Sequence, residues 1–337
     1  SVLLEKNNFD SVWMTDVLFE GGPELVLPEV FALMTAVGLN TKRIQLGTAV
    51  IDALSRHPAK LAQTTATVDN ILDGRTVYGI GGGETINHEP FGIPTTNVYK
   101  KLRETIQILK LLWTASYMNP ASYEGEFYSL RQAYLKIRPK TKPHPPIYLP
   151  AFGPKMLEMT GELADGWIPF NHTPETYDKF LNGSIKPTLE KNGRSLSEFD
   201  PAHIFVTAVS KDPAIAAETV KKEVKNWLVW SPDILRISAP QVHHPGKRQP
   251  FIKSRIKDDL EVQAKLSQEI PDEVALKVAL WGTPDDCIQR LECYMKSGLR
   301  HVVLFFVSTP GETVDRMVEL FSTKVIPYFR SSSDIGQ

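Results

Sequence analysis

Three consecutive glycines followed directly by an acid form the most distinctive chemical motif of the sequence. The segment "YGIGGGETINHEP", residues 78–90, comes after an apolar, strand-like run. Glycine leaves the backbone bare, so a flat ligand could lie against Gly81, Gly82 and Gly83 with Glu84 beside it. A carboxyl group in such a place can give or take a proton when burial raises its pKa towards neutrality. A flexible turn with a solvated glutamate is the alternative, and the segment alone leaves it open.

The glycine run does not fit the two common phosphate-binding motifs. The dinucleotide fingerprint G-x-G-x-x-G would have Glu84 at its third glycine position, where a carboxylate would repel a pyrophosphate. Pro90 and Pro94 follow and argue against a helix directly after the loop. The P-loop motif needs Gly-Lys-Ser/Thr, which the segment lacks. The remaining interpretation is a strand end that brings Glu84 and Asn87 to the C-terminal face of a barrel.

Short β-branched and aromatic runs alternate with longer helical patterns along the chain. Such alternation predicts a parallel sheet, either doubly wound or closed into a barrel. We expect strands near residues 11–15, 44–50, 76–80, 146–151, 166–169, 203–209 and 301–307. We expect helices near residues 28–39, 58–72, 98–115, 154–164, 174–191, 212–229, 254–268, 284–297 and 311–328. Several of the strands are apolar on both faces, which is typical of buried parallel strands.

A (β/α)8 barrel has eight strands, one more than the sequence displays. The first residues, "SVLLEKNN", look like the end of a helix that leads into the first visible strand. We therefore predict a single (β/α)8 TIM barrel over residues 1–330 whose first strand lies before Ser1, with a C-terminal tail at 331–337. Two insertions are expected, a hairpin over the barrel mouth within 116–145 and a long excursion at 230–283. An open seven-stranded sheet is the alternative.

The composition gives no sign of a nucleic-acid or membrane partner and indicates a redox compartment. The 337 residues carry a formal net charge of -1, so nothing global points to nucleic acid or to a membrane surface. No apolar run approaches the roughly 20 residues that span a bilayer. Cys287 and Cys293 fall in one expected helix and on different faces of it, which disfavours a disulfide or a metal site. This cysteine usage fits a reducing cytoplasm.

Five segments, spread over nearly the whole chain, carry a resemblance to a known family. They are "FDSVWMTD", "RIQLGTAVIDALSRHPAKLAQTTATVDNILDGR", "YGIGGGETIN", "IYLPAFGPKMLEMTGELADGWIP" and "GTPDDCIQRLECYMKSGLRHVVLFF". Together they resemble the bacterial luciferase-like superfamily, and within it the branch that uses the deazaflavin coenzyme F420. That branch includes F420-dependent glucose-6-phosphate dehydrogenase, methylenetetrahydromethanopterin reductase, secondary alcohol dehydrogenase and phthiodiolone-type ketoreductases.

The resemblance implies where the cofactor binds. In the family a strand bulge carries a non-prolyl cis peptide against the middle of the deazaflavin ring, and the matching residues are Ala49 and Val50. An ordinary trans strand is the alternative. Asp52 matches a position that contacts the polar edge of the ring, and the loop 151–155 matches one whose amides bind the pyrimidine edge or the tail. The expected cofactor-binding residues are Ala49, Val50, Asp52, Gly82, Gly83, Asn87, Ala151, Phe152, Gly153 and Lys155.

Glu84 and Asp16 are the expected catalytic residues. Glu84 and Asn87 match the family pattern GE-x-x-N, in which the glutamate of the sugar-phosphate dehydrogenase donates a proton to the deazaflavin. Asp16 matches the aspartate that ends the second barrel strand in the family motif TDH. Val17 stands where that dehydrogenase has its catalytic histidine, which disfavours any mechanism that needs an imidazole there. A structural role for Asp16, as a helix or loop cap, is the alternative.

Other charged and imidazole groups are assigned structural roles. We expect His57, in "SRHP", to fix its loop and cap the following helix rather than act as a base. The basic stretch 246–257 is interpreted as solvated surface, with the binding of an anionic tail or substrate as the alternative. His243 and His244 lack the further ligands at fixed spacing that a metal needs, so no metal is expected.

The residues and the resemblance together predict an F420-dependent oxidoreductase. It would transfer a hydride between C5 of F420 and a small or medium organic substrate. Ketone or alcohol chemistry is expected first, and reduction of a methylene-tetrahydropterin second. An FMN-dependent luciferase-like monooxygenase and a non-catalytic cofactor-binding barrel are the alternatives. Luciferase-like barrels commonly dimerise through the helices beside their second and third strands, so the resemblance also implies a homodimer.

Overall fold

The structure, a computed structural model, describes residues 1–18, 26–229, 235–236, 256–308, 311 and 313–333. Contacts within the chain divide it into two units. The first comprises Ser1–Glu5, Asp10–Pro150 and Glu162–Gly166, and the second comprises Lys6–Phe9, Ala151–Gly161 and Trp167–Gln337. The single domain expected over residues 1–330, and the strand expected before Ser1, stay predictions.

Parallel strands that follow one another along the chain form the sheet of the first unit. β1 (Ser11–Met14) pairs with β2 (Gln45–Asp52), β2 pairs with β3 (Thr76–Gly81), and β3 pairs with β6 (Ile147–Leu149). Every residue of β3 and β6 is buried, as expected for central parallel strands. Because parallel strands need a crossover between them, all of their C-terminal ends lie at one edge of the sheet.

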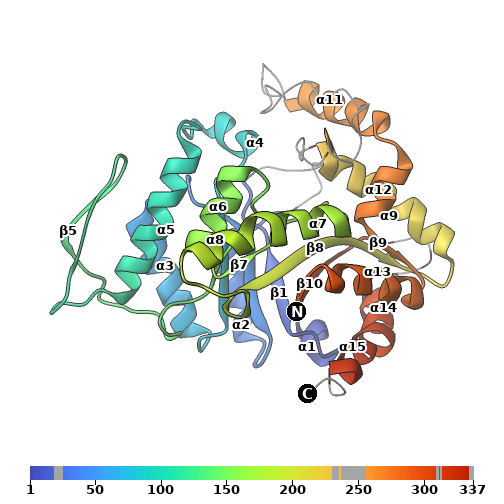
Figure 1. The fold of residues 1–337 in the computed structure, drawn as a ribbon, viewed down its shortest axis with the longest axis horizontal. Coiled ribbons are helices and arrows are strands. Elements are labelled where there is room, and N and C mark those ends of the chain that lie inside the picture. Colours follow the sequence, from blue (N-terminus) through green and yellow to red (C-terminus); the bar gives the residue numbers. More distant parts are fainter. Residues whose placement is uncertain (19–25, 230–234, 237–255, 309–310, 312, 334–337) are drawn as a thin grey trace. The chain divides into compact units, whose positions relative to one another are not determined.

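Helices of the first unit supply these crossovers. They are α2 (Val30–Leu39), α3 (Pro58–Ile71), the single turn α4 (Thr85–His88) and α5 (Val98–Thr114). Figure 1 shows α3 and α5 as neighbours beside the blue strands. The indole N–H of Trp113 on α5 donates a hydrogen bond to the carbonyl oxygen of Ala62 on α3, at 3.1 Å. This buried contact fixes the two helices against each other.

An antiparallel hairpin follows α5, as predicted within residues 116–145. It consists of β4 (Ala121–Glu124) and β5 (Ser129–Ala133), and it extends from α5 at the left of Figure 1. Glu104, in the second turn of α5, accepts hydrogen bonds from the backbone N–H groups of Glu126, Phe127 and Tyr128. A helix-borne carboxylate therefore holds the hairpin turn near the N-terminal end of α5.

The second unit contains a sheet centred on one long strand, β8 (Asp200–Val209). β10 (His301–Phe306) pairs along most of it, and β9 (Leu280–Gly282) pairs with its last three residues, both in parallel. β9 was not foreseen and lies within 230–283, the stretch expected to be an insertion. Three residues are too few to produce a periodic sequence signal. The two-residue strand β7 (Gly166–Trp167) lies at the expected position.

The structure describes further helices, and all of them except α12 overlap segments in which the sequence predicts a helix. They are α1 (Val2–Lys6), α6 (Pro154–Leu163), α7 (Pro174–Phe180), α8 (Lys186–Lys191), α9 (Pro213–Val229), α11 (Ile256–Glu269), α12 (Asp272–Val278), α13 (Pro284–Lys296), α14 (Val314–Leu320) and α15 (Ile326–Ser333). Thr173 and Thr283 each cap a helix with the hydroxyl and precede a proline at the first helical position. α12 is the one helix of this set that the sequence did not predict.

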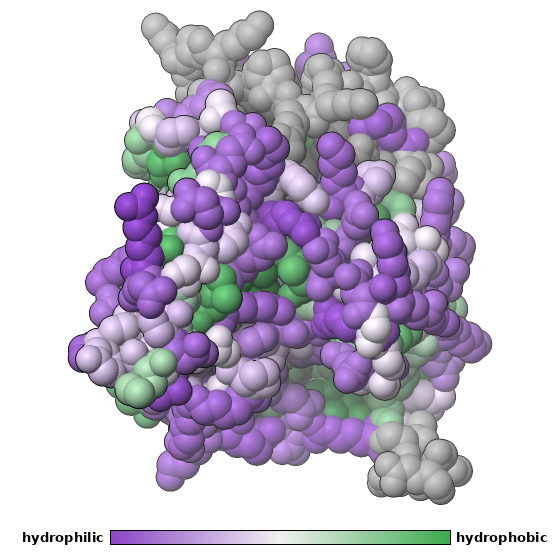
Figure 2. Space-filling model, turned by 60° about the vertical axis from the view of Figure 1, so that its left-hand side comes forward, coloured by the Kyte–Doolittle hydropathy of each residue, from purple (hydrophilic) through white to green (hydrophobic). Residues whose placement is uncertain are grey.

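The surface is polar, as the composition leads one to expect. The face drawn in Figure 2 is mainly hydrophilic, with apolar side chains in small patches between the polar ones. Within the part of the chain that the structure describes, no helix combines the length and the apolar character that crossing a bilayer requires. Cys287 is buried and Cys293 is exposed, so the two cysteines lie on different faces of α13, as predicted.

Two buried histidines lie in the core of the second unit. His172 and His203 have no exposed surface, and the backbone N–H of His172 donates to Nε2 of His203 at 3.2 Å. Both ring nitrogens of His172 and Nδ1 of His203 have no hydrogen-bond partner among the described residues. Burial lowers the pKa of His172 to about 3. Burial, and next the charge of His172, lowers the pKa of His203 well below its ordinary value, so both rings are neutral at pH 7.

We expect the free energy of unfolding to fall as the pH drops below about 6.5. Unfolded His172 takes up a proton near its ordinary pKa of 6.5, whereas folded His172 does so only near pH 3. Protons therefore favour the unfolded chain between these values. The linkage between protonation and folding predicts that His172 lowers the free energy of unfolding by about 1.4 kcal/mol at about pH 5.5. His203 lowers it further. Urea unfolding curves measured between about pH 7.5 and pH 5.5 test this.

Two variants isolate the effect. His172→Phe keeps an aromatic ring but cannot titrate. The fall in its free energy of unfolding between about pH 7.5 and pH 5.5 should therefore be smaller by about 1.4 kcal/mol. Met118→Gln, at an 86% exposed position with no titrating side chain, should leave the dependence as it is. A pH dependence of the same steepness in His172→Phe and in the original protein would contradict the explanation.

Candidate active site

β2 carries one residue more than β3 just before the last two residue pairs of the two strands. Ala49 and Val50 together face the single residue Gly79 of β3. This is a β-bulge, which bends a strand and changes the direction of its side chains. The peptide bond between Ala49 and Val50 is cis. Both residues are partly exposed, whereas Thr48 and Ile51 on either side are fully buried.

The glycines of β3 make room for this bulge. A Cβ atom at Gly79 would lie 2.1 Å from the carbonyl oxygen of Thr48. A Cβ atom at Gly81 would lie 2.8 Å from Cγ2 of Val50. Since no real Cβ contact is that short, any larger residue would push the two strands apart. The bulge of β2 therefore requires glycine at these positions of β3.

Gly82 and Gly83 also have protein atoms close to them. A Cβ atom at Gly82 would lie 2.3 Å from Cγ1 of Val98. Gly83 has a φ of +68°, and its Cβ atom would lie 2.3 Å from Nε2 of His88 and 2.5 Å from Oδ1 of Asp52. Internal packing is thus one reason for the glycine run, while Gly82 is partly exposed and Gly83 is exposed. A role of Gly82 and Gly83 in binding a cofactor stays a prediction.

Asp52 and His88 form a buried pair that joins the end of β2 to the loop after β3. Nε2 of His88 lies 2.7 Å from Oδ2 of Asp52, and the side chains are 1% and 8% exposed, respectively. Burial alone would raise the pKa of Asp52, but the hydrogen bond and charge of His88 and the N–H of Leu54 lower it below its ordinary value. The carboxylate is therefore ionised at neutral pH, so Nε2 of His88 is the donor.

Asp16, which follows β1, is held by a bidentate contact with Arg56. Nη1 and Nη2 of Arg56 lie 2.5 Å and 3.0 Å from Oδ2 and Oδ1 of Asp16. The backbone N–H of Asp52 also donates to Asp16, at 3.0 Å. Burial would lower the pKa of Arg56, but its hydrogen bonds to Asp16 and Glu29 raise it. This geometry favours the structural role of Asp16, and its catalytic role stays a prediction.

Glu84 directly precedes a single helical turn, α4, which contains Asn87. α4 begins directly after Glu84, so the expectation that the two following prolines prevent a helix here is wrong. The first of them only limits its length, because α4 ends at His88, two residues earlier. The Glu84 side chain is exposed. Asn87 is buried, and its Oδ1 accepts the backbone N–H of Leu18 at 3.0 Å.

These contacts bring together the expected site residues of the first unit at the C-terminal ends of three neighbouring strands. The position matches the edge at which α/β barrels carry their active sites. Asp52 joins the three strand ends, because its backbone bonds Asp16 after β1 and its side chain bonds His88 after β3. The expected residues found here are Ala49, Val50, Asp52, Asp16, Gly82, Gly83, Glu84 and Asn87.

The loop Ala151–Lys155 belongs to the second unit and leads into α6. The carbonyl oxygen of buried Ala151 accepts the indole N–H of Trp167 at 2.9 Å. The Phe152 ring stacks on His172, with the ring centres 5.7 Å apart. A Cβ atom at Gly153 would have no neighbour within 4 Å, and Lys155 is exposed. The cofactor-binding role of this loop stays a prediction.

The sequence did not mark His88 and Arg56 as site residues. His88 is the last residue of α4, and only recognition of that turn would have directed attention to it. Arg56 directly precedes His57, whose imidazole is the more obvious candidate for a catalytic base. Nδ1 of His57 accepts the backbone N–H of Ala59 at 3.2 Å, which confirms the predicted helix cap.

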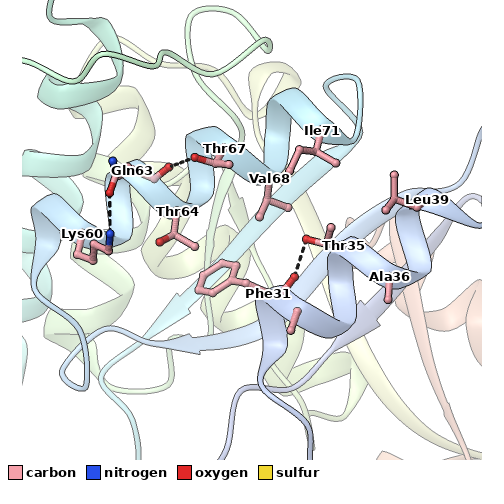
Figure 3. Close-up of a pocket in the computed structure, with 11 residues that line it drawn as sticks. Phe31, Thr35, Ala36, Leu39, Lys60, Gln63, Thr64, Thr67, Val68 and Ile71 are labelled. Carbon is pink, nitrogen blue, oxygen red and sulfur yellow. Dashed lines mark hydrogen bonds between the residues drawn. The ribbon is translucent and has the colours of Figure 1, made fainter.

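No group of three or more His, Cys, Asp or Glu side chains that could hold a metal occurs in the described part of the chain. His243, His244 and the basic residues 247–255 lie outside it. A groove between α2 and α3 is drawn in Figure 3. Phe31 and Leu39 line it from α2, while Val68 and Ile71 line it from α3. The groove contains none of the expected site residues.

Known proteins resemble this chain over most of its length. Residues 1–301 match the family model described as luciferase-like monooxygenase. F420-dependent glucose-6-phosphate dehydrogenase from Nakamurella multipartita is 28% identical over 98% of this chain and 91% of that protein. The 5,10-methylenetetrahydromethanopterin reductase of Archaeoglobus fulgidus is 28% identical over 96% of this chain and 93% of that protein. These matches confirm the predicted resemblance.

A solved structure confirms the fold class. It is that of an F420-dependent secondary alcohol dehydrogenase in complex with an F420–acetone adduct, and it superposes with a TM-score of 0.80. The match covers 96% of this chain and 92% of that chain, at 21% sequence identity. The fold is therefore of the luciferase-like, TIM-barrel-like α/β class that the sequence predicted.

Replacement of Gly79 by alanine should destabilise the protein strongly. The added methyl group would meet the backbone oxygen of Thr48, which cannot move without disturbing the pairing of β2 with β3. Overpacking of this kind costs about 3 kcal/mol. Gly183→Ala is the matched control, because its Cβ atom meets nothing within 4 Å. Urea unfolding measures both variants, and an equal effect would contradict the packing argument.

Proposed function

The chain belongs to the luciferase-like monooxygenase family, and from this premise we propose that it is an F420-dependent oxidoreductase. It transfers a hydride between C5 of F420 and an organic substrate. The relatives named above include an F420-dependent dehydrogenase. The observation that carries the proposal is the bulge at Ala49–Val50, which is partly exposed between buried neighbours and adjoins the strand that leads to Glu84. A flat ring with a polar edge fits such a surface.

When bound, F420 supplies a deazaflavin ring that gives or takes a hydride at C5. The residues of this chain bind and orient that ring. Ala49, Val50, Asn87 and the backbone at Gly82 and Gly83 would hold it. Asp52 would act through its hydrogen bonds to these loops, since its carboxylate is buried. By resemblance to the family, the backbone amides of Ala151, Phe152 and Gly153, together with Lys155, bind the pyrimidine edge or the tail.

Glu84 holds the proton in this proposal. Its side chain is exposed, so a ring that covers it removes water and raises its pKa towards neutrality, where it can donate a proton. Asp16 contributes by fixing Arg56 and the end of β2, because both of its oxygens already accept hydrogen bonds from the guanidinium group. Val17 gives no imidazole base at the position where the sugar-phosphate dehydrogenase has one.

Ketone or alcohol chemistry is the first choice of reaction. The solved structure that resembles this chain is named a secondary alcohol dehydrogenase, which supports this choice. Reduction of a methylene-tetrahydropterin is the second choice, supported by the named reductase. The proposal includes a cytoplasmic location. The alternatives to this function are an FMN-dependent monooxygenase and a barrel that binds the cofactor without catalysis.

The protein should bind F420 more tightly than FMN, and Glu84→Gln should lower kcat by about 100-fold. The amide keeps the shape of the side chain but cannot donate the proton, and positioned acids contribute about 100- to 10,000-fold. Binding is measured by fluorescence titration. Turnover is measured with F420 and its reduced form on a panel of secondary alcohols and ketones, glucose 6-phosphate and methylenetetrahydromethanopterin.

The alternatives give different results in the same experiment. Preference for FMN, together with oxygen consumption by the reduced flavin, would replace the proposal by the monooxygenase. F420 binding without turnover of any panel member would support the non-catalytic barrel. Equal kcat values in Glu84→Gln and the original protein would exclude Glu84 as the proton donor.

We also propose that the protein forms a homodimer through the outer faces of α2 and α3. The family resemblance supports this, and so does the groove in Figure 3, which Leu39 of α2 and Ile71 of α3 line. Leu39 on α2 is 68% exposed and Ile71 on α3 is 47% exposed. Exposed apolar side chains gathered in one place are typical of protein interfaces.

The double variant Leu39→Glu/Ile71→Glu should be monomeric. Two buried, unpaired carboxylates would oppose association, while the same residues are tolerated at the surface of a monomer. Sedimentation equilibrium should give twice the chain mass of 37.8 kDa for the original protein and the single mass for the variant. Met118→Glu, at an 86% exposed position outside the groove, is the control and should remain a dimer. A monomeric original protein would reject the proposal.

A further inference from the structure

The Asp52–His88 pair connects the rigid sheet to the turn that carries Glu84. Asp52 is the last residue of β2, and several contacts besides His88 fix its position. Its backbone N–H donates to Asp16, and its carboxylate accepts the N–H groups of Leu54 and Ser55. His88 is the last residue of α4, four positions after Glu84. The hydrogen bond between the two side chains therefore ties the end of α4 to a fixed point.

α4 needs such an anchor, because four residues do not form a stable helix by themselves. A helix nucleus is unfavourable, and isolated helices shorter than about 12 residues are marginal in water. The backbone N–H of Asn87 donates to the carbonyl oxygen of Glu84, and that of Ile93 donates to the carbonyl oxygen of His88. These bonds persist only while the turn is held against the sheet. The anchors are the Asn87 side chain, which binds Leu18, and the His88 side chain, which binds Asp52.

The same pair also supports the residue that precedes Glu84. Gly83 lies so close to the Asp52 and His88 side chains that any Cβ atom would overlap both. Its φ of +68° turns the chain from β3 into α4, a conformation that glycine adopts without strain. Glu84 is thus fixed on both sides, by Gly83 resting on the pair and by His88 forming it. The buried hydrogen bond between His88 and Asp52 therefore helps to set the position of Glu84.

We propose that His88 is a positioning residue, which holds Glu84 in place for proton transfer through its hydrogen bond to Asp52. This inference rests on the proposed function, in which Glu84 is the proton donor. His88 does not touch the reacting atoms, because its side chain is 1% exposed. Loss of its hydrogen bond lets α4 open and displaces the Glu84 carboxyl. A displacement of about 1 Å in a catalytic group lowers turnover by about 100-fold.

Two substitutions separate the hydrogen bond from the space that the ring fills. His88→Leu removes the donor and keeps a similar volume. His88→Gln keeps an N–H group that can reach Oδ2 of Asp52. We expect kcat to fall by about 30- to 100-fold in His88→Leu, with the dissociation constant of F420 within about threefold of the original value. We expect His88→Gln to restore most of the loss. If His88→Leu does not fold, His88→Asn, which is polar but too short, takes its place.

A double-mutant cycle shows whether His88 acts through Glu84. If it does, His88→Leu lowers kcat by less than about threefold in a Glu84→Gln background, since the positioned acid is already absent. Independent effects would multiply, and that result would overturn the proposal. His301→Leu is the control variant. His301 makes a similar contact with Asp200, at 2.9 Å, but at the N-terminal starts of β10 and β8. Its loss should leave kcat unchanged.

Hydrogen exchange provides a readout that needs no substrate. In His88→Leu the amides of Asn87 and Ile93 should exchange at least about tenfold faster, while that of Leu46 in β2 should not change. Unchanged exchange at Asn87 and Ile93 would overturn the anchoring role. Faster exchange with unchanged kcat would overturn the positioning role. A Glu84→Gln variant with full activity would instead reject Glu84 as the proton donor. The exchange rates do not depend on that role, so they show separately whether His88 anchors α4.

Discussion

The buried carboxylate of Asp52 is the interaction on which the arrangement at the strand ends depends. An ionised carboxylate under 10% exposed is costly unless hydrogen bonds and charge compensate it. Here His88 and two backbone N–H groups supply that compensation, and the Asp52 backbone in turn bonds Asp16. The two N–H groups belong to the loop that directly follows Asp52, whereas His88 comes from the turn after β3 and Asp16 follows β1. The side chain and backbone of one residue therefore connect three strand ends of the first unit.

The glycine run is the second constraint, and it shows how a motif can be explained in two ways. Sequence alone explains bare backbone by a ligand, because ligands are a common reason for glycine. The structure explains it by the bulge of β2 and by the Asp52–His88 pair, both of which occupy the space of the missing side chains. These explanations are compatible. A bulge that pushes Val50 against Gly79 and Gly81 also leaves the strand partly exposed where a ring can lie.

The sequence predicted most of the fold, and the reasons for the exceptions are physical. Long periodic segments such as α3, α5 and β8 were placed within a few residues, and the cap at His57 was identified, because each is determined by local pattern. β9 and α4 were missed because three or four residues carry no period, and their existence depends on tertiary contacts. His88 and Arg56 were missed for the same reason, since their partners lie 36 and 40 residues away.

The three carboxylates at these strand ends have similar chemistry but different environments, and the environment assigns their roles. Asp16 is held by a guanidinium group, whereas Asp52 is buried beside an imidazole that keeps its pKa below the ordinary value, so Asp52 stays ionised near neutral pH. Glu84 is exposed, and its pKa therefore responds to whatever ligand covers it. Carboxyl groups with separated pKa values are the usual way in which one site obtains both a fixed charge and a mobile proton. A ring bound over the bulge would raise the pKa of Glu84 only while it is bound. The proposed proton donation by Glu84 would therefore depend on occupancy of the site.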